Sequence, residues 1–211
     1  LNVVIYRLPR MMESEWRSDC SILLHDQLNP NQAPYIYENM TLSKPASRCP
    51  SCAHKIRWYE NIPLVSWIAL LGRCSACGAS IGIRYPVVEL LTMLASLMVL
   101  YVFGPTVQMV CALVLTWSLI ALTGIDFDTQ LLPDRITLPL AAAGLFVNAQ
   151  SLFVSPTQAI WGYVLGFLVL WVVYILFKIV TGKEGMGYGD FKLLAALGAW
   201  LGPMQLPLII F

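Results

Sequence analysis

Four long apolar segments dominate the second half of the chain. They cover residues 86–103, 106–125, 135–153 and 159–180, with a shorter apolar segment at 191–201 and another that begins near Met204. Each long segment approaches the roughly 20 residues that a helix needs to cross a bilayer. Lipid offers the backbone no hydrogen-bond partner, so such segments must satisfy their own peptide groups. The predicted fold class is an all-α polytopic membrane protein, a helical bundle.

The composition agrees with this fold and divides the chain in two. Apolar residues make up 58% and charged residues 12%, against about 45–50% and about 25% in soluble domains. Of the 25 charged residues, 16 lie in residues 1–90. The net charge of +1 gives no electrostatic basis for binding nucleic acid. A polar N-terminal part is therefore expected before a part that contacts membrane lipid.

The chain is expected to contain three parts. Residues 1–8 are interpreted as the end of a first transmembrane helix, residues 9–85 as a cytoplasmic domain, and residues 86–211 as the transmembrane domain. Within the second part, residues 10–48 are predicted to form a variable loop. The apolar stretch 63–71 is too short to span a bilayer and should lie at the interface or pack on the small domain. Both chain ends fall in apolar stretches, so we expect a fragment that lacks its first and last transmembrane helices.

The distribution of basic residues orients the predicted helices. The turns at 104–105 and 154–157 carry no Lys or Arg, whereas the loops at 126–135 and 178–192 carry four, and the N-terminal region carries nine. Basic loops tend to remain cytoplasmic. The cysteine-containing domain and both basic loops are therefore predicted on the cytoplasmic side of a multi-pass protein.

Two aspartates stand at the ends of apolar segments on that side. Asp126 ends one segment, and Asp190 opens another after Gly187-Tyr188-Gly189. A carboxylate at the mouth of a membrane helix is costly unless it meets water or a partner. The glycines permit close backbone approach and positive φ, and we expect Gly187 and Gly189 to support movement of this loop. An interfacial acid and an ordinary helix cap remain as alternative readings.

Two further acids lie near Asp126. Asp128 is interpreted as a solvated loop residue. Asp134, which follows Pro133 and precedes an apolar segment, is expected to cap free backbone N–H groups at a helix start.

A close pair of aspartates has a defined chemistry. Carboxylates about 3 Å apart cannot both ionise, so they share a proton. One can then act as a general base on water while the other donates to a carbonyl oxygen, which is aspartic peptidase chemistry. The competing hypothesis is a transporter or scaffold in which Asp126 and Asp190 bind protons or ions.

Four cysteines form two pairs with metal-ligand spacing. Cys49-Pro-Ser-Cys52 and Cys74-Ser-Ala-Cys77 offer four thiolates, which suit tetrahedral zinc. Two disulfides are the alternative, disfavoured on a cytoplasmic face where thiols stay reduced. The predicted zinc site is structural, because four thiolates leave no position open for water.

Two segments also carry a family resemblance. The string from Ile125 to Asp134 and the string from Thr181 to Leu194 resemble the two signature segments of bacterial type IV prepilin peptidases. These enzymes are also called prepilin leader peptidases/N-methyltransferases and belong to the Gly-x-Gly-Asp class of aspartic proteases. The resemblance extends over residues 1–9 and 49–89. It implies that Asp126 and Asp190 form the catalytic pair.

The resemblance also implies a substrate and a second activity. The expected reaction is cleavage of prepilin and pseudopilin leader peptides at the cytoplasmic face of the bacterial inner membrane. Members with the four cysteines also methylate the new N-terminal residue, usually Phe, with S-adenosylmethionine. The chain has no glycine-rich turn of the Rossmann type, so the donor-binding residues stay unknown and methylation rests on the resemblance alone. The sequence contains no signal for an oligomeric state.

Overall fold

The computed structural model describes residues 1–28, 40–183 and 185–210. These residues are largely helical and contain only isolated β-bridges. They divide into two compact units, residues 1–97 and 98–211, which are described separately below.

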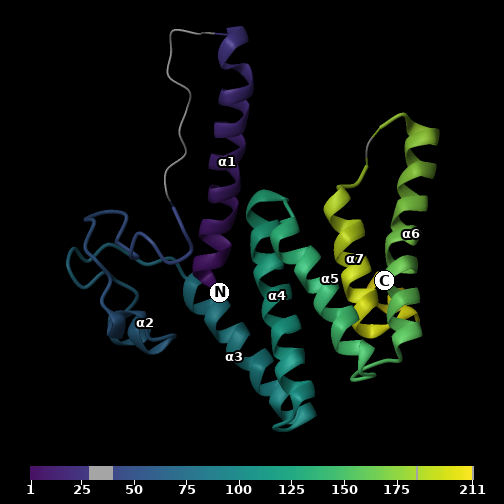
Figure 1. The fold of residues 1–211 in the computed structure, drawn as a ribbon. Coiled ribbons are helices and arrows are strands. Elements are labelled where there is room, and N and C mark those ends of the chain that lie inside the picture. The colour runs from purple at the N-terminus through teal and green to yellow at the C-terminus, as the bar shows by residue number, and fades with distance from the viewer. Residues whose placement is uncertain (29–39, 184, 211) are drawn as a thin grey trace. The chain divides into compact units, whose positions relative to one another are not determined.

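The first unit begins with helix α1, Asn2–Leu28 (Figure 1). The loop predicted for residues 10–48 is therefore wrong over residues 10–28. Glu13 and Arg17 pair at 2.6 Å one turn apart, and the guanidinium of Arg10 lies 3.7 Å from the ring centre of Tyr6. Straight-chain residues and such i,i+4 pairs favour a helix even where the segment shows no apolar stripe. Residues 40–47 are irregular, Arg48 forms an isolated bridge with Lys55, and residues 29–39 lie outside the described residues.

The small domain follows, with the short helices η1, Trp58–Asn61, and α2, Val65–Ala69. The indole of Trp67 donates to the carbonyl of Ile81 at 3.5 Å. Its ring also covers Gly72, where a Cβ would lie 2.9 Å from a ring carbon. Of the two alternatives for the apolar stretch 63–71, these contacts support packing on the small domain. The carboxylate of Glu89, in helix α3 (Arg84–Phe103), accepts the N–H of Leu64 at 2.9 Å and ties the two helices together.

The second unit contains the remaining helices. They are α4 (Val107–Thr129), α5 (Asp134–Ala149), α6 (Pro156–Thr181), α7 (Tyr188–Leu201), η2 (Pro203–Gln205) and α8 (Leu206–Ile210). The predicted apolar segments are thus confirmed as helices. Helices α3, α4 and α6 are long and apolar enough to cross a membrane. Helix α5 has 16 residues and a length of about 24 Å, which is shorter than predicted.

Helix α7 lies at the core of this unit and packs against α5 and α6 (Figure 1). A Cβ on Gly162 or on Gly198 would lie 2.1 Å from the carbonyl oxygen of the other residue. The backbones of α6 and α7 are therefore in direct contact, as small residues allow between membrane helices. On the α5 side, the buried indole of Trp200 donates to the carbonyl of Leu140 at 2.8 Å.

Asn148 ties the far ends of α5 and α7 together. Its amide donates to the carbonyls of Ala199 and Trp200 at 2.8 and 3.0 Å. Its carbonyl accepts the backbone N–H groups of Phe153 and Val154 at 3.0 and 3.1 Å. The side chain is fully buried, and every one of its donors and acceptors is used in this network.

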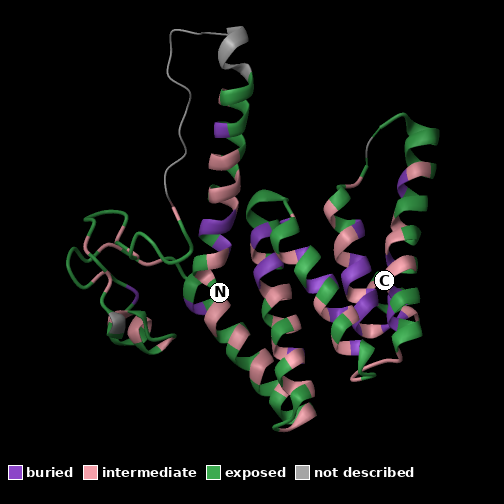
Figure 2. Ribbon diagram, viewed as in Figure 1, coloured by how far each residue is buried: buried purple, intermediate pink, exposed green. Residues whose placement is uncertain are grey.

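The outer helix faces are apolar and exposed. Buried residues gather where α5, α6 and α7 meet, whereas the outward sides of α3, α4 and α6 are mostly exposed or half-buried (Figure 2). Trp161, Leu176 and Val180 of α6 are 60%, 58% and 83% exposed. Contiguous apolar surface of this kind needs lipid to cover it. The fold is that of a membrane protein.

Replacing Gly198 with Ala should destabilise the second unit. The added methyl would collide with the backbone of Gly162 and push α6 and α7 apart, which lowers the unfolding temperature measured in detergent by several degrees. Gly82→Ala is the matched control, because a Cβ there meets no atom within 4 Å. Equal unfolding temperatures for the two variants would contradict the backbone contact.

Candidate active site and metal centre

Asp126 lies in the last turn of α4. The helix ends at Thr129, and the next residue, Gln130, adopts a left-handed conformation with φ of 52°. The N–H of Gln130 donates to the carbonyl of Asp126 at 2.8 Å. This closure ends the helix one turn after Asp126, whose side chain is exposed.

Asp190 lies in the first turn of α7, which is not among the three candidate membrane spans. Its pKa is raised, first because neighbouring protein removes part of its carboxyl from water and second because of the charge on Asp126. A hydrogen bond with the backbone of Gly187 acts in the opposite direction. The second unit thus brings the two predicted carboxylates near enough for their charges to interact.

The glycines before Asp190 allow a close approach rather than an unusual backbone angle. A Cβ on Gly189 would lie 2.8 Å from the Cβ of Leu132, so only glycine fits between α7 and the segment before α5. At Gly187 a Cβ would meet only the Asp190 carboxylate, at 3.8 Å. Neither glycine has a positive φ. Of the two properties that glycine permits, Gly189 uses the close approach, and neither position uses a positive φ.

Asp134 does not cap α5. Pro133 occupies the N-cap position with no side-chain cap bond, and both carboxylate oxygens of Asp134 accept from Lys192 at 2.8 and 2.6 Å. The expected cap is wrong because Asp134 is the first helical residue and points across to α7. This ion pair joins the starts of α5 and α7, two residues after Asp190. Asp128 is exposed, as predicted, but belongs to α4 rather than to the loop.

An aromatic cluster supports the same turn of α7 from the α6 side. The rings of Tyr174, Tyr188 and Phe191 lie 5.6–5.7 Å apart between centres. Phe191 is fully buried, and it follows Asp190 directly. Aromatic pairs at this separation stabilise a contact beyond the area that they bury, so the backbone that carries Asp190 is held on two sides.

The first unit gathers the four predicted metal ligands. The sulfur atoms of Cys49 and Cys77 lie 3.8 Å apart, those of Cys52 and Cys74 lie 4.0 Å apart, and all four lie within 4.8 Å of one another. A tetrahedral zinc ion with bonds of about 2.3 Å to sulfur requires about 3.8 Å between sulfurs. The donor set and its dimensions therefore fit zinc.

The two cysteine loops repeat one backbone pattern. In each loop, the carbonyl of the first cysteine accepts a 2.9 Å hydrogen bond from the residue after the second, which are Ala53 and Gly78. Both of those residues have a positive φ, 58° and 71°. Equal turns from both halves of the small domain thus direct the two cysteine pairs toward one point.

The thiols of the four-cysteine cluster influence one another electrostatically. Hydrogen bonds from the backbone of Cys52 and Ser51 lower the pKa of Cys49 to about 6. The backbone of His54 also favours the thiolate of Cys52, but loss of water contact and the neighbouring thiols raise its pKa to about 12. A second negative charge in the cluster is therefore disfavoured. A divalent cation is the partner that would allow all four thiols to ionise.

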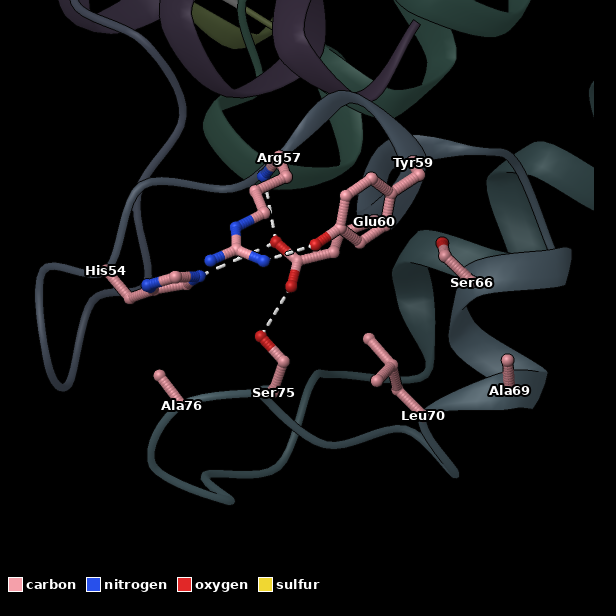
Figure 3. Close-up of a pocket in the computed structure, with 9 residues that line it drawn as sticks. All are labelled: His54, Arg57, Tyr59, Glu60, Ser66, Ala69, Leu70, Ser75 and Ala76. Atoms are coloured by element: carbon pink, nitrogen blue, oxygen red, sulfur yellow. Dashed lines mark hydrogen bonds and ion pairs between the residues drawn. The ribbon is translucent and has the colours of Figure 1, made fainter.

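A pocket of about 470 Å³ lies beside the cysteine loops (Figure 3). Glu60 stands at its centre, where its carboxylate accepts the N–H of Arg57 at 2.8 Å and the hydroxyl of Ser75 at 2.5 Å. These two donors, in that order, lower the pKa of Glu60 and keep it ionised. His54 is half-buried, and its Nε2 atom lies 3.6 Å from a carboxylate oxygen of Glu60. No sequence motif marks Glu60.

The fold and these sites define a class of protein: a helical membrane protein with a pair of aspartates at helix ends and a small four-cysteine domain. Residues 1–103 match the family model "Bacterial Peptidase A24 N-terminal domain", and residues 113–211 match that of the type IV leader peptidase family. The chain belongs to the type IV leader peptidase family.

Relatives with the name prepilin leader peptidase/N-methyltransferase are similar over the whole chain. Those from Stutzerimonas stutzeri and Pseudomonas aeruginosa are each 55% identical over 210 residues, and that from Aeromonas hydrophila is 52% identical over 211. Each match covers 100% of this chain and 71% of the relative. No solved structure is significantly similar.

Zinc binding can be tested by removing one ligand. Cys49→Ser should lower the zinc content of the purified protein from about one ion per chain to a small fraction, because three thiolates and a hydroxyl bind zinc far more weakly. The content is measured by mass spectrometry of the metal. Cys111→Ser, which changes a cysteine outside the cluster, should keep its zinc. A full zinc complement in Cys49→Ser would contradict the four-cysteine site.

Proposed function

We propose that this protein is an aspartic endopeptidase that cleaves the leader peptide of type IV prepilins and pseudopilins, with Asp126 and Asp190 as its catalytic pair. The observation that carries this proposal is the match of residues 113–211 to the type IV leader peptidase family, because this segment contains both Asp126, in the last turn of α4, and Asp190, in the first turn of α7. The charge of Asp126, which helps to raise the pKa of Asp190, supports it. Membership of the leader peptidase family and the names of the relatives support the reaction.

The two carboxylates divide the chemistry between them. The raised pKa of Asp190 favours its role as the proton donor, and we assign the role of general base to Asp126. Asp126 takes a proton from water as the water oxygen attacks the scissile carbonyl carbon, and Asp190 donates to the carbonyl oxygen. When the C–N bond of the tetrahedral intermediate breaks, Asp126 gives the proton that it took from water to the leaving amine, and Asp190 takes back a proton from the hydroxyl that becomes the new carbonyl oxygen. The residues return to their starting state without a covalent enzyme intermediate.

The reaction belongs at the cytoplasmic face of the bacterial inner membrane. The basic residues of the loops at 126–135 and 178–192 favour that side. A prepilin with a short leader and an apolar helix would keep the helix in lipid and present the scissile bond at the interface. The exposed apolar faces of the membrane helices offer such a helix a surface of matching polarity.

The second proposed activity is N-methylation of the new N-terminal residue with S-adenosylmethionine. It is supported by the N-methyltransferase name of the relatives. Zinc on Cys49, Cys52, Cys74 and Cys77 would be structural, since four thiolates complete its tetrahedron. In that role the metal supplies no reaction chemistry and holds the small domain together.

Replacing either aspartate by asparagine should abolish leader cleavage. Asp126→Asn removes the base, and Asp190→Asn removes the proton donor, so each should lower the cleavage rate of a prepilin in detergent by a factor of at least about 100. Asp128→Asn is the matched control and should cleave at nearly the wild-type rate. Product masses report cleavage, and thermal unfolding reports folding. Normal cleavage by Asp126→Asn or Asp190→Asn would refute the assignment and favour a transporter or scaffold.

The same pair predicts a pH dependence. Because the pKa of Asp190 is raised, the pair should keep its shared proton to a higher pH than an isolated aspartate would. Cleavage should fall as the pH rises through the upper apparent pKa of the pair, since both groups are then ionised. The rate constant of the bound substrate, measured from pH 4 to 9, tests this. A rate that keeps rising across this whole range would contradict the shared proton.

The Asp134–Lys192 ion pair should position Asp190. Lys192→Met frees the start of α7 and should lower kcat several-fold, while stability changes by only about 1 kcal/mol or less because the pair is partly exposed. The double variant Asp134→Lys, Lys192→Asp restores opposite charges and should recover much of kcat. Lys183→Met serves as the control for loss of one nearby positive charge. An unchanged kcat in Lys192→Met would show that the ion pair does not position Asp190.

A further inference from the structure

Four segments of the small domain build the walls of the pocket beside the cysteine cluster (Figure 3). His54 comes from the end of the first cysteine loop, and Ser75 lies between the cysteines of the second. Arg57 and Glu60 come from the start and body of η1, and Ala69 comes from α2. The pocket exists only where both cysteine loops meet these helices.

Its charged groups are fixed before any ligand arrives. Glu60 is held as a carboxylate by the N–H of Arg57 and the hydroxyl of Ser75. The guanidinium of Arg57 donates to the hydroxyl of Tyr59, a residue that is 44% exposed. The buried Nε2 atom of His54 makes no hydrogen bond but lies 3.6 Å from the Glu60 carboxylate, so its hydrogen-bonding capacity is not fully used.

These groups match a ligand that carries both charges and an aromatic ring. A carboxylate recognises a cation, a guanidinium recognises a carboxylate with two parallel hydrogen bonds, and an exposed tyrosine ring stacks on a flat base. The volume of about 470 Å³ lies within the range of about 300–1,000 Å³ typical of small-molecule sites. Leu70, Ala69 and Ala76 supply the apolar part of the lining.

We propose that this pocket binds S-adenosylmethionine, with Glu60 facing its cationic part, Arg57 its carboxylate and Tyr59 its adenine. This inference rests on the proposed methyltransferase activity and assigns that activity a site. The donor is a sulfonium compound with an amino-acid end and a purine, which is the combination of charges and ring that the lining offers.

The location of the pocket links the metal to methylation. Its wall includes residues from both cysteine loops, and a zinc ion on the four cysteines would hold these loops together. A zinc ion with a purely structural role would therefore be required for donor binding, although the ion itself does not contact the donor. Loss of zinc should remove methylation and leave the aspartate pair of the second unit intact.

The test is equilibrium binding of radiolabelled S-adenosylmethionine to the full-length protein in detergent, together with product masses after prepilin cleavage. Glu60→Gln removes the negative charge, and Ala69→Phe fills the pocket from α2 without touching the cysteine loops. Both variants should bind the donor at least about tenfold more weakly and methylate less, with unchanged cleavage and zinc content. Glu13→Gln, which alters an exposed acid of α1, is the matched control and should bind normally.

The possible outcomes distinguish an error in the assigned donor site from an error in the proposed methyltransferase activity. If wild type and both variants methylate and bind the donor equally, the pocket assignment is overturned while the methyltransferase function stands. If Glu60→Gln loses zinc, donor binding by Ala69→Phe, which keeps its zinc, decides whether the pocket binds the donor. A wild type that cleaves prepilin but neither binds the donor nor methylates overturns the activity and the pocket assignment with it. Methylation lost with donor binding intact also overturns the donor assignment.

Discussion

The backbone contact between α6 and α7 is the constraint on which the second unit depends. Gly162 and Gly198 bring the two helices closer than any side chain permits, and α7, with only 14 residues, is too short to be fixed by spanning a bilayer. Its position is instead set by its neighbours. Because Asp190 sits in its first turn, the placement of one proposed catalytic carboxylate follows from helix packing at the opposite end.

The aspartate pair shows how a costly charge is accommodated. Asp126 lies in the last turn of a helix and Asp190 in the first turn of another, so neither carboxylate lies in the middle of an apolar helix. The first turn of α7 favours an anion, whereas the last turn of α4 does not. The two sites therefore differ in their surroundings although they carry the same side chain, and such a difference suits a pair that divides the roles of acid and base.

Most of the helices and both candidate sites could be predicted from the sequence, because apolar length and cysteine spacing are local signals. The helix at residues 10–28 was missed because its stability comes from helix-forming residues and ion pairs rather than from a stripe. Asp134 was misread because its partner, Lys192, is 58 positions away. Glu60 could not be recognised from the sequence because only its contact with Arg57 is local, and Ser75 becomes its neighbour when the two cysteine loops meet.

The two ends of α7 are held by different kinds of interaction. At its C-terminal end, Asn148 and Trp200 form a buried network that salt and water hardly reach. At its N-terminal end, the tether that joins α7 to α5 is the half-exposed pair of Asp134 and Lys192, which counter-ions weaken. Raising the salt concentration should therefore weaken the contact between α5 and α7 at this end only, while the rings of Tyr174 and Tyr188 around the fully buried Phe191 keep the first turn in place on α6. The start of α7 can thus loosen on its α5 side without losing the packing that keeps the unit folded.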